Sequence, residues 1–404
     1  MFVQWRSGAM FYLMGATLGY PGGLELDSLI RLGRENNADV QVSRRETESV
    51  AQDTLAVRTR SNPALEVEAL RNLDEGTAPK AGARLSQEFH PGVRARQFKV
   101  SRARYSAVQE IQKARELDLV LNIRSTFFAW QILDRKGKLQ QEVRGRWESL
   151  SHLATAKVAE GTLSQVDQLQ TQLNSAKARQ REMEIRTEME SLERKLALLT
   201  GQEKLSDSLA HSLPDSLPEI PRLDWVLSWV DMNSPDLEAL NKEVSVQKEQ
   251  FSLEQSLRNP SFNLSLGYER EIDGTQLVGG GLVFPLPLFN RNQFGITKAK
   301  STLQIAELRK AAAAQNLRSD LSEIHGRLVK LGERYRDYQR QIKDLSGKQL
   351  SLSEKGFRQG LLGVFDLSRV QEEALNQDLE ALNVLGGFYD LWNRLGRILG
   401  GKTW

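Results

Sequence analysis

Residues 97–104, Gln-Phe-Lys-Val-Ser-Arg-Ala-Arg, return at residues 293–300 as Gln-Phe-Gly-Ile-Thr-Lys-Ala-Lys, with identical or similar residue types at nearly every position. Asn62-Pro63 returns in the same way as Asn259-Pro260. Self-similarity at a nearly constant spacing indicates a tandem duplication, so we expect two structural repeats of one fold. Further pairs at this spacing are Gly161 and Gly360, Asp167 and Asp366, and Leu199-Thr200-Gly201 with Leu399-Gly400-Gly401.

The composition excludes several classes of function. The chain has 404 residues, 55 Lys and Arg, 52 Asp and Glu, and a net charge of +3. Both signs are interspersed, which is typical of solvated helix faces and differs from the basic patches of a nucleic-acid binder. Because the chain has no cysteine, it has no disulfide, no thiolate metal site and no lipid-modified cysteine. The four histidines are scattered, so we expect no metal site, no cofactor and no catalytic residues; they are His90, His152, His211 and His325.

The first residues have the pattern of a secretory signal. Arg6 precedes the apolar run 9–16, and the small residues around Gly19 and Pro21 follow. A short basic region, a short apolar region and small residues predict a signal peptide over residues 1–22, with a plain disordered terminus as the alternative. No stretch of about 18 apolar residues is present, so we expect no transmembrane helix.

The prolines predict where long helices lie. Residues 92–213 and 288–404 contain none, which permits helices of unusual length. Pro214, Pro218 and Pro221 lie between the two stretches. We therefore predict a first repeat over 23–213, a linker over 214–222 and a second repeat over 223–404. Each repeat is expected to contain a helix, two strands and a long helical hairpin.

The second long stretch has a heptad seam, which predicts one helix of roughly 60 residues, about 95 Å long, from Asn292 to about Lys355. A step of four residues from Leu317 to Leu321 is a stutter. In each repeat a break at Gly161 or Gly360 is followed by a second helix, over 165–199 and 365–399. The seam residues are Ile296, Ala299, Leu303, Ala306, Ala313, Leu317, Leu321, Ile324, Leu328, Leu331, Tyr335, Tyr338, Ile342, Leu345 and Leu352.

Four runs are expected to form strands, two in each repeat. Residues 261–269 alternate apolar and polar side chains without a miss, and runs 65–69 and 83–89 do so nearly as well. Residues 277–284 form a Gly-rich fourth run. Such alternation is typical of strands in an outer-membrane barrel and also of a half-buried sheet in a soluble protein. Four strands cannot close a barrel of at least eight, so a membrane barrel would be shared between chains.

The order of these elements resembles that of the TolC family of outer-membrane efflux proteins over about residues 24–401. Residues 284–293, Phe-Pro-Leu-Pro-Leu-Phe-Asn-Arg-Asn-Gln, resemble the segment from the last strand into the long helix in the CzcC-like branch of RND heavy-metal efflux systems. The resemblance implies an α+β, mainly α, duplicated fold in a homotrimer. Each chain would supply four strands to a β-barrel in the cell outer membrane and helical hairpins to a periplasmic α-barrel.

The resemblance also implies a function without enzymatic chemistry. The trimer would be the exit duct of a tripartite pump, with a periplasmic adaptor and an inner-membrane RND-type pump as partners, and with outer-membrane lipid around the barrel. The exported cargo would be cations. The same fold could serve a drug or type I protein exporter, and a different class remains open, a soluble coiled-coil scaffold.

The implied functional residues lie at the hairpin tips and at the start of the long helix. Asp167, Asp366 and Arg369 would line the tip aperture. Some relatives place a second acid where this chain has Arg369, so contacts between Asp366 and Arg369 could lock a closed state. The two aspartates are also candidates for helix N-caps. Expected for adaptor docking are Gly161, Thr162, Leu163, Ser164, Gly360, Leu361, Leu362 and Gly363; expected at the junction from barrel to helix are Pro285, Pro287 and Asn290.

Overall fold

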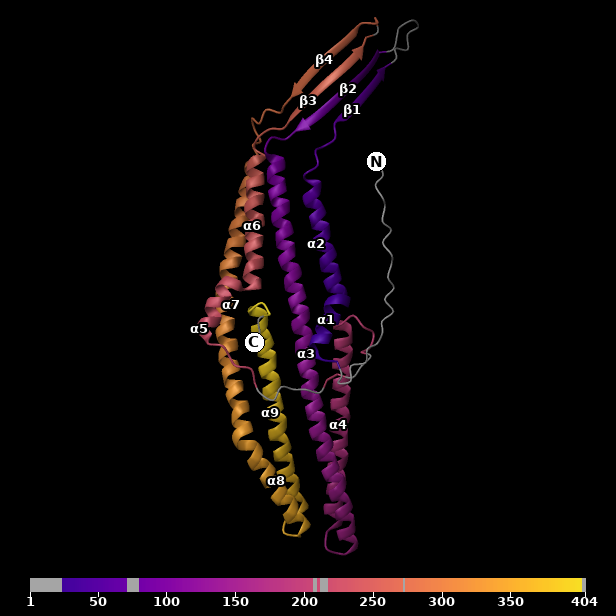
Figure 1. Ribbon diagram of the computed structural model, residues 1–404, viewed down its shortest axis with the longest axis vertical. Helices are drawn as coiled ribbons and strands as arrows, with labels where there is room; N and C mark the ends of the chain where they lie inside the picture. The colour runs from indigo at the N-terminus through magenta and orange to yellow at the C-terminus, as the bar shows by residue number, and fades with distance from the viewer. Residues whose placement is uncertain (1–23, 71–79, 206–208, 211–216, 272, 402–404) are drawn as a thin grey trace, which may run out of the picture.

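The computed structural model describes residues 24–70, 80–205, 209–210, 217–271 and 273–401. The expected signal segment, 1–22, and residues 214–216 of the expected linker lie outside this range. The described chain is elongated, with a sheet at one end and two helical tips at the other (Figure 1). None of the described helices has the length and apolarity that a membrane crossing requires.

The duplication is visible in the order of the elements. Each repeat contains a short helix, a longer helix, two strands and a long hairpin. The first repeat consists of α1 (Leu26–Asn36), α2 (Ala38–Ala56), β1 (Ala64–Leu70), β2 (Lys80–Phe89), α3 (Val93–Ala159) and α4 (Gln165–Leu199). The second consists of α5 (Leu223–Asn233), α6 (Pro235–Ser256), β3 (Phe262–Arg270), β4 (Gln276–Val283), α7 (Gln293–Asp337), the π turn η1 (Tyr338–Ile342), α8 (Lys343–Arg358) and α9 (Val364–Ile398). The predicted strands and hairpins are confirmed.

The four strands form one antiparallel sheet in the order β1-β2-β3-β4. Leu85 of β2 pairs with Leu65 of β1 and with Leu266 of β3, and Leu266 in turn pairs with Gly280 of β4. The two repeats therefore join through β2 and β3. One edge of β1 and one edge of β4 have no strand beside them among the described residues.

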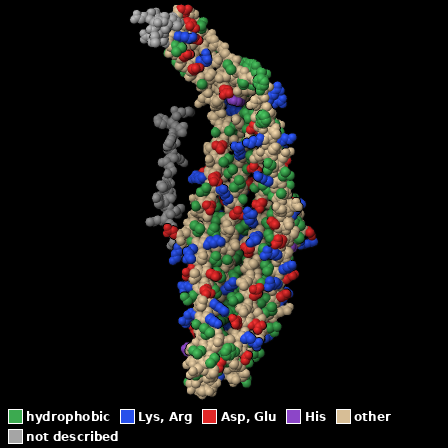
Figure 2. Space-filling view, turned by 180° about the vertical axis from the view of Figure 1, so that it is seen from behind, with side chains coloured by type: hydrophobic (Ala, Val, Ile, Leu, Met, Phe, Trp, Pro, Cys, Tyr) green, Lys and Arg blue, Asp and Glu red, His purple; other side chains and the backbone are tan. Residues whose placement is uncertain are grey.

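The long helices below the sheet lie side by side in an elongated strip (Figure 1). Near the sheet the order across the strip is α2, α3, α6, α7, and near the tips it is α4, α3, α9, α8. The helix α3 runs through both halves and contacts both α6 and α9 of the second repeat. Charged side chains of both signs are spread along the helical body, as the composition predicts (Figure 2).

Apolar side chains at the middle and lower levels hold the strip together. One cluster joins α3, α5, α7 and α9 and includes Phe388 and Trp392. A second joins α1, α3 and α4, and a third lies near the tips. Arg397 at the end of α9 donates to Asp118 of α3 (2.7 Å) and to Asp236 of α6 (3.2 Å). These carboxylates raise the pKa of the Arg397 guanidinium, and the three side chains tie both repeats together.

The predicted helix from Asn292 to about Lys355 is present without a break over α7, η1 and α8, but the predicted seam is wrong beyond the π turn. The π turn at 338–342, where the Lys343 N–H donates to the carbonyl of Tyr338, adds a residue to the helix. Up to Tyr338 the predicted seam is confirmed, and Leu321 and Leu328 are fully buried. Beyond the turn the buried residues are Ser353 and Phe357, each one position after the place that the heptad gives, and Leu350 is half-buried. The predicted seam residues Ile342, Leu345 and Leu352 are exposed instead.

Gly201 ends α4 in a conformation that only glycine adopts easily, at φ +69°. A Cβ there would lie 2.5 Å from the carbonyl oxygen of Asn36, at the end of α1. Gly201→Ala is expected to lower the thermal midpoint, because the left-handed conformation alone costs about 1–2 kcal/mol and the clash adds to it. Gly360→Ala is the matched control, since φ is +76° and the added Cβ meets nothing within 4 Å. Equal losses for both variants would contradict the close approach of α1.

Candidate functional site

The first hairpin tip, residues 160–164, is held by backbone and side-chain hydrogen bonds. Gly161 has φ +72°, and the N–H of Thr162 donates to the carbonyl of Lys157 (2.9 Å), which satisfies an end carbonyl of α3. Ser164 is the N-cap of α4: its Oγ accepts from the N–H of Asp167 (3.1 Å) and donates to the Asp167 carboxylate (2.7 Å). The Asp167 carboxylate thus holds the capping hydroxyl in place, although it does not bond the Ser164 N–H as the acid of a capping box would. The tip is therefore a stiff turn.

The second tip, residues 359–363, has the same turn and a more apolar surface. Gly360 has φ +76°, and the N–H of Leu361 donates to the carbonyl of Gly356 (2.8 Å). Val364 and Leu367 are fully buried, whereas Leu361 and Phe365 are 75% and 61% exposed. The tip thus exposes the apolar side chains of Leu361 and Phe365, whereas the buried side chains of Val364 and Leu367 stabilise it.

The N-cap prediction for the two aspartates needs correction. Asp167 and Asp366 occupy the third helical position, and the N-caps are Ser164 and Gly363. Asp167 reinforces its cap through Ser164, but α9 has no side-chain cap. Both carboxylates lie in the first turn, where a negative charge stabilises a helix. Among the described residues no ion pair joins Asp366 to Arg369 within one chain, so a contact between copies stays a prediction.

The two hairpins are tied to each other near the tips by contacts that sequence reasoning missed. The amide of Asn174 on α4 donates to the hydroxyl of Ser368 on α9 (2.7 Å). Lys157 on α3 donates to the carbonyl of Arg358 (3.4 Å), and its ammonium lies 5.7 Å from the centre of the Phe357 ring. Movement of one tip is therefore coupled to the other.

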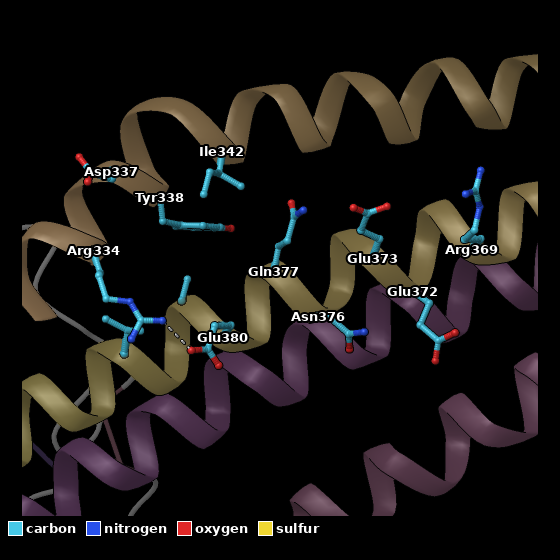
Figure 3. A pocket seen from close by; sticks show the side chains of 12 residues that line it. Arg334, Asp337, Tyr338, Ile342, Arg369, Glu372, Glu373, Asn376, Gln377 and Glu380 are labelled. Carbon is cyan, nitrogen blue, oxygen red and sulfur yellow. Dashed lines mark hydrogen bonds and ion pairs between the residues drawn. The ribbon is translucent and has the colours of Figure 1, made fainter.

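An open groove of about 680 Å³ lies between α9 and the segment from α7 to α8, at the π turn (Figure 3). Tyr338 donates to Asp378 across it, and Arg334 donates to Glu380 (3.1 Å). Burial and the neighbouring carboxylate raise the pKa of Tyr338, so its hydroxyl stays a donor. Arg369 lies at one end of the groove, beyond Glu373 (Figure 3).

The predicted residues at the junction from β4 to α7 form hydrogen-bonded turns together with their neighbours in the sequence. Pro287 is the centre of a tight turn in which the N–H of Leu288 donates to the carbonyl of Leu286 (2.8 Å). Asn290 accepts from the N–H of Asn292 (3.0 Å). Asn292, which we did not single out, has φ +55° and donates to Glu254 of α6 (2.8 Å). Pro285 is exposed at the start of the loop.

The histidines and carboxylates of the described part of the chain do not form a metal-binding cluster. No group of three or more His, Asp and Glu residues there could hold a metal ion. His325 instead contacts the carbonyl of Pro221 (2.8 Å), and His90 lies 3.3 Å from Glu88. The residues available for function are therefore the tips, the groove and the free edges of the strip.

The family model described as "Outer membrane efflux protein" matches residues 29–202 and 227–401. The chain belongs to this family, which is a family of transport proteins and not of enzymes. The predicted membership of the TolC family is thereby confirmed.

Two similar proteins are each known for a form of resistance. The chain is 22% identical over 390 residues to the cobalt-zinc-cadmium resistance protein CzcC of Cupriavidus metallidurans, covering 94% of this chain and 90% of that protein. It is also 22% identical over 416 residues to the putative multidrug resistance outer membrane protein MdtQ of Shigella flexneri, covering 93% and 86%. Both names refer to resistance, to cobalt, zinc and cadmium in the first and to multiple drugs in the second.

Solved structures share the fold over nearly the whole chain. The crystal structure of CusC has a TM-score of 0.79 at 16% identity, covering 99% of both chains. A membrane protein from Pseudomonas aeruginosa has a TM-score of 0.81 at 17% identity, covering 99% of this chain and 96% of that one. The predicted α+β, mainly α, fold is confirmed.

Proposed function

We propose that three copies of this chain form an outer-membrane channel that is the exit duct of a tripartite cation efflux pump. The observation that carries the proposal is the open strip, because among the described residues no strand or long helix of the same chain lies beyond its two sides. β1 and β4 bear free edges in the sheet, α2 and α7 lie at the sides of the upper helical layer, and α4 and α8 lie at the sides of the lower one. Free strand edges are unstable in lipid, so copies side by side would satisfy them.

Exposed apolar side chains support closure into a ring. On α2, Val42 and Leu55 are each 54% exposed, and on α7 Ile305 and Leu308 are exposed as well. Two copies would give a barrel of eight strands, and the side chains that point inward would fill its interior. Three copies give twelve strands and leave an open lumen, so a duct requires at least three.

The proposed place of the chain is the cell outer membrane, with the helical body in the periplasm. The exposed Leu361 and Phe365 and the capped turns at Gly161 and Gly360 form the surface on which a periplasmic adaptor would dock. We assign Thr162, Leu163, Leu362 and Gly363 to the same surface. An RND-type inner-membrane pump would supply the energy. The similarity to CzcC favours cations as the cargo, and the similarity to MdtQ makes drug efflux the second candidate.

The test is outer-membrane fractionation of the full chain, combined with gels of heated and unheated samples. We expect a band at three times the chain mass that disappears on boiling. A strain that lacks the chain should lose tolerance of divalent transition metals and regain it with the wild-type gene. A soluble monomer would contradict the channel, and restored tolerance of drugs alone would favour the second candidate.

Arg369→Ala is expected to raise the single-channel conductance in planar bilayers about two-fold or more, because three positive charges leave an aperture that carries cations. The matched control is Arg394→Ala, another exposed arginine of α9, which lies far from the tip and pairs with Asp390 (3.2 Å). An unchanged conductance in Arg369→Ala would remove this residue, and its proposed contacts with Asp366, from the gate.

A further inference from the structure

Six arginines next to the sheet have no acidic partner among the described residues. α2 and α6 end beside the sheet, and α3 and α7 begin there (Figure 1). Farther along the helices ion pairs are frequent, such as Arg186 with Glu190. The acids near the sheet, Glu88 and Glu254, contact residues other than arginine. The six unpaired residues, which we call the arginine collar, are Arg58, Arg60, Arg94, Arg96, Arg258 and Arg291.

The helix dipoles do not explain the whole collar. Bases stabilise the C-terminal ends of α2 and α6, but Arg94 and Arg96 lie at the start of α3, where a positive charge is unfavourable. α3 and α7 have no acid in the first turn, whereas α4 and α9, which begin at the tips, have Asp167 and Asp366 there. The helix ends beside the sheet therefore present positive charge that the described chain does not balance.

Large apolar side chains are exposed at the same level. Phe284, Leu286, Leu288 and Phe289, in the loop from β4 to α7, are 53%, 67%, 65% and 91% exposed. Figure 2 shows hydrophobic side chains at the base of the sheet with Lys and Arg side chains beside them. A surface that combines exposed aromatic and aliphatic side chains with bases is typical of the boundary between lipid tails and head groups.

The apolar face of the sheet has a hollow beside this loop. Leu264 of β3 pairs with Leu282 of β4, so both lie on one face, and the other face carries charged side chains such as those of Arg84 and Glu269. The hollow has a volume of about 280 Å³ and is lined by Pro260, Ser261, Phe262, Leu282 and Phe284. Arg258 of the collar lies two residues before the first of these. A phosphate at Arg258 and an acyl chain in the hollow can therefore belong to one lipid.

We propose that the arginine collar, the exposed loop and the hollow form a binding surface for anionic phospholipid, in the leaflet of the outer membrane that faces the helical body. The lipid phosphates supply the negative charge that the described chain lacks at this level, and the acyl chains cover the apolar side chains. Because each base near an anionic lipid surface adds to the attraction, the collar prefers anionic to zwitterionic lipid. The inference rests on the proposed place of the sheet in the outer membrane.

The test is the rise in the thermal midpoint of the full chain in detergent as phosphatidylglycerol or phosphatidylcholine is added. We expect phosphatidylglycerol to bind about ten-fold more tightly, because its head group is anionic. The variant with Arg60→Gln, Arg96→Gln and Arg258→Gln removes three collar bases whose side chains have no hydrogen bond within the described chain. It should reduce the preference to about two-fold or less.

The matched control removes three exposed arginines outside the collar, each of which pairs with an acid of its own helix. It carries Arg186→Gln, Arg327→Gln and Arg394→Gln, and it changes the net charge by the same amount. The control should keep the full preference for phosphatidylglycerol. Equal preferences in the two variants would overturn the collar. Isolated peptidoglycan that displaced phosphatidylglycerol from the full chain would also overturn it, because an anionic polymer would then be the occupant.

A second pair of variants tests the hollow. Phe284→Ala should weaken the binding of both lipids to a similar extent, because it removes an apolar wall and no charge. Phe365→Ala, at a tip and also exposed, should weaken neither. Equal effects of the two variants would remove the hollow from the binding surface.

Failure of the lipid surface and failure of the proposed function give different results. A full chain that enters outer membranes but binds the two lipids alike would overturn the lipid surface and leave the channel in place. A full chain that is absent from outer membranes would overturn the proposed function itself.

Discussion

Phe388→Ala is expected to lower the free energy of unfolding by about 3–5 kcal/mol, the largest effect of any side-chain truncation that we predict. Phe388 of α9 is fully buried where α9 meets α7. Its ring lies 6.0 Å from that of Trp392 in a stacked arrangement and meets Tyr389 edge-on at 5.9 Å. The surrounding side chains come from α3, α5, α7 and α9 and pack against one another. We therefore expect the cavity to persist and its full cost to be felt.

The measurement is denaturant unfolding of the protein in detergent, followed by circular dichroism. Leu198→Ala is the control, because Leu198 of α4 is 74% exposed and its truncation is expected to change stability by less than about 0.5 kcal/mol. If Phe388→Ala unfolded at the same denaturant concentration as this control, the central cluster would not hold α9 to α7.

The elements that the sequence predicted well are those with local causes. Alternation over residues 261–269 is a property of one strand, and it matches β3 to within a residue. The absence of proline over 92–213 and 288–404 and the glycines at the tips set the lengths of the hairpins. The duplication then doubled each observation, because a weak pattern in one copy could be checked against the other.

The π turn could not be predicted, because residues 338–342, Tyr-Gln-Arg-Gln-Ile, contain no glycine or proline that would mark it. Leu345 and Leu352 continue the heptad of the preceding helix, whereas the less exposed positions beside them are Ser346, which is half-buried, and Ser353, which is buried. Apolarity alone therefore favoured the wrong face. Only packing against α9 decides between the two rows, and that information lies in the tertiary structure.

The turns of the hairpin tips could be located from the sequence, but the contacts between distant residues at the site could not be predicted. Ser164 and Asp167 have the spacing of a capping box, so this cap was readable from the sequence. The bond between Asn174 and Ser368 joins residues 194 positions apart and leaves no local pattern. Asn292 was missed for another reason, since its left-handed conformation follows from the bond to Glu254 on a neighbouring helix.

Deletion of Gln341 from the π turn is expected to be tolerated, with a change in the free energy of unfolding of less than about 1 kcal/mol. The turn holds one residue more than a regular helix, so its removal restores the α-helical hydrogen bonds. Tyr338 on one side and Ser353 and Phe357 on the other keep their faces toward α9. Gln341 itself is exposed. The exposed row at Leu345 and Leu352 would also keep its direction.

Deletion of Lys330, an exposed residue of α7, is the matched control with the opposite expectation. The regular helix there has no residue to spare, so the deletion turns the following segment by about 100°. Leu331 and Tyr335 would leave the core, at about 1.5–3 kcal/mol for each buried side chain, and Tyr338 would lose Asp378. Thermal denaturation of the two variants beside the wild type measures the difference. If both deletions were equally harmful, the extra residue of the π turn would be required for stability and would not be dispensable.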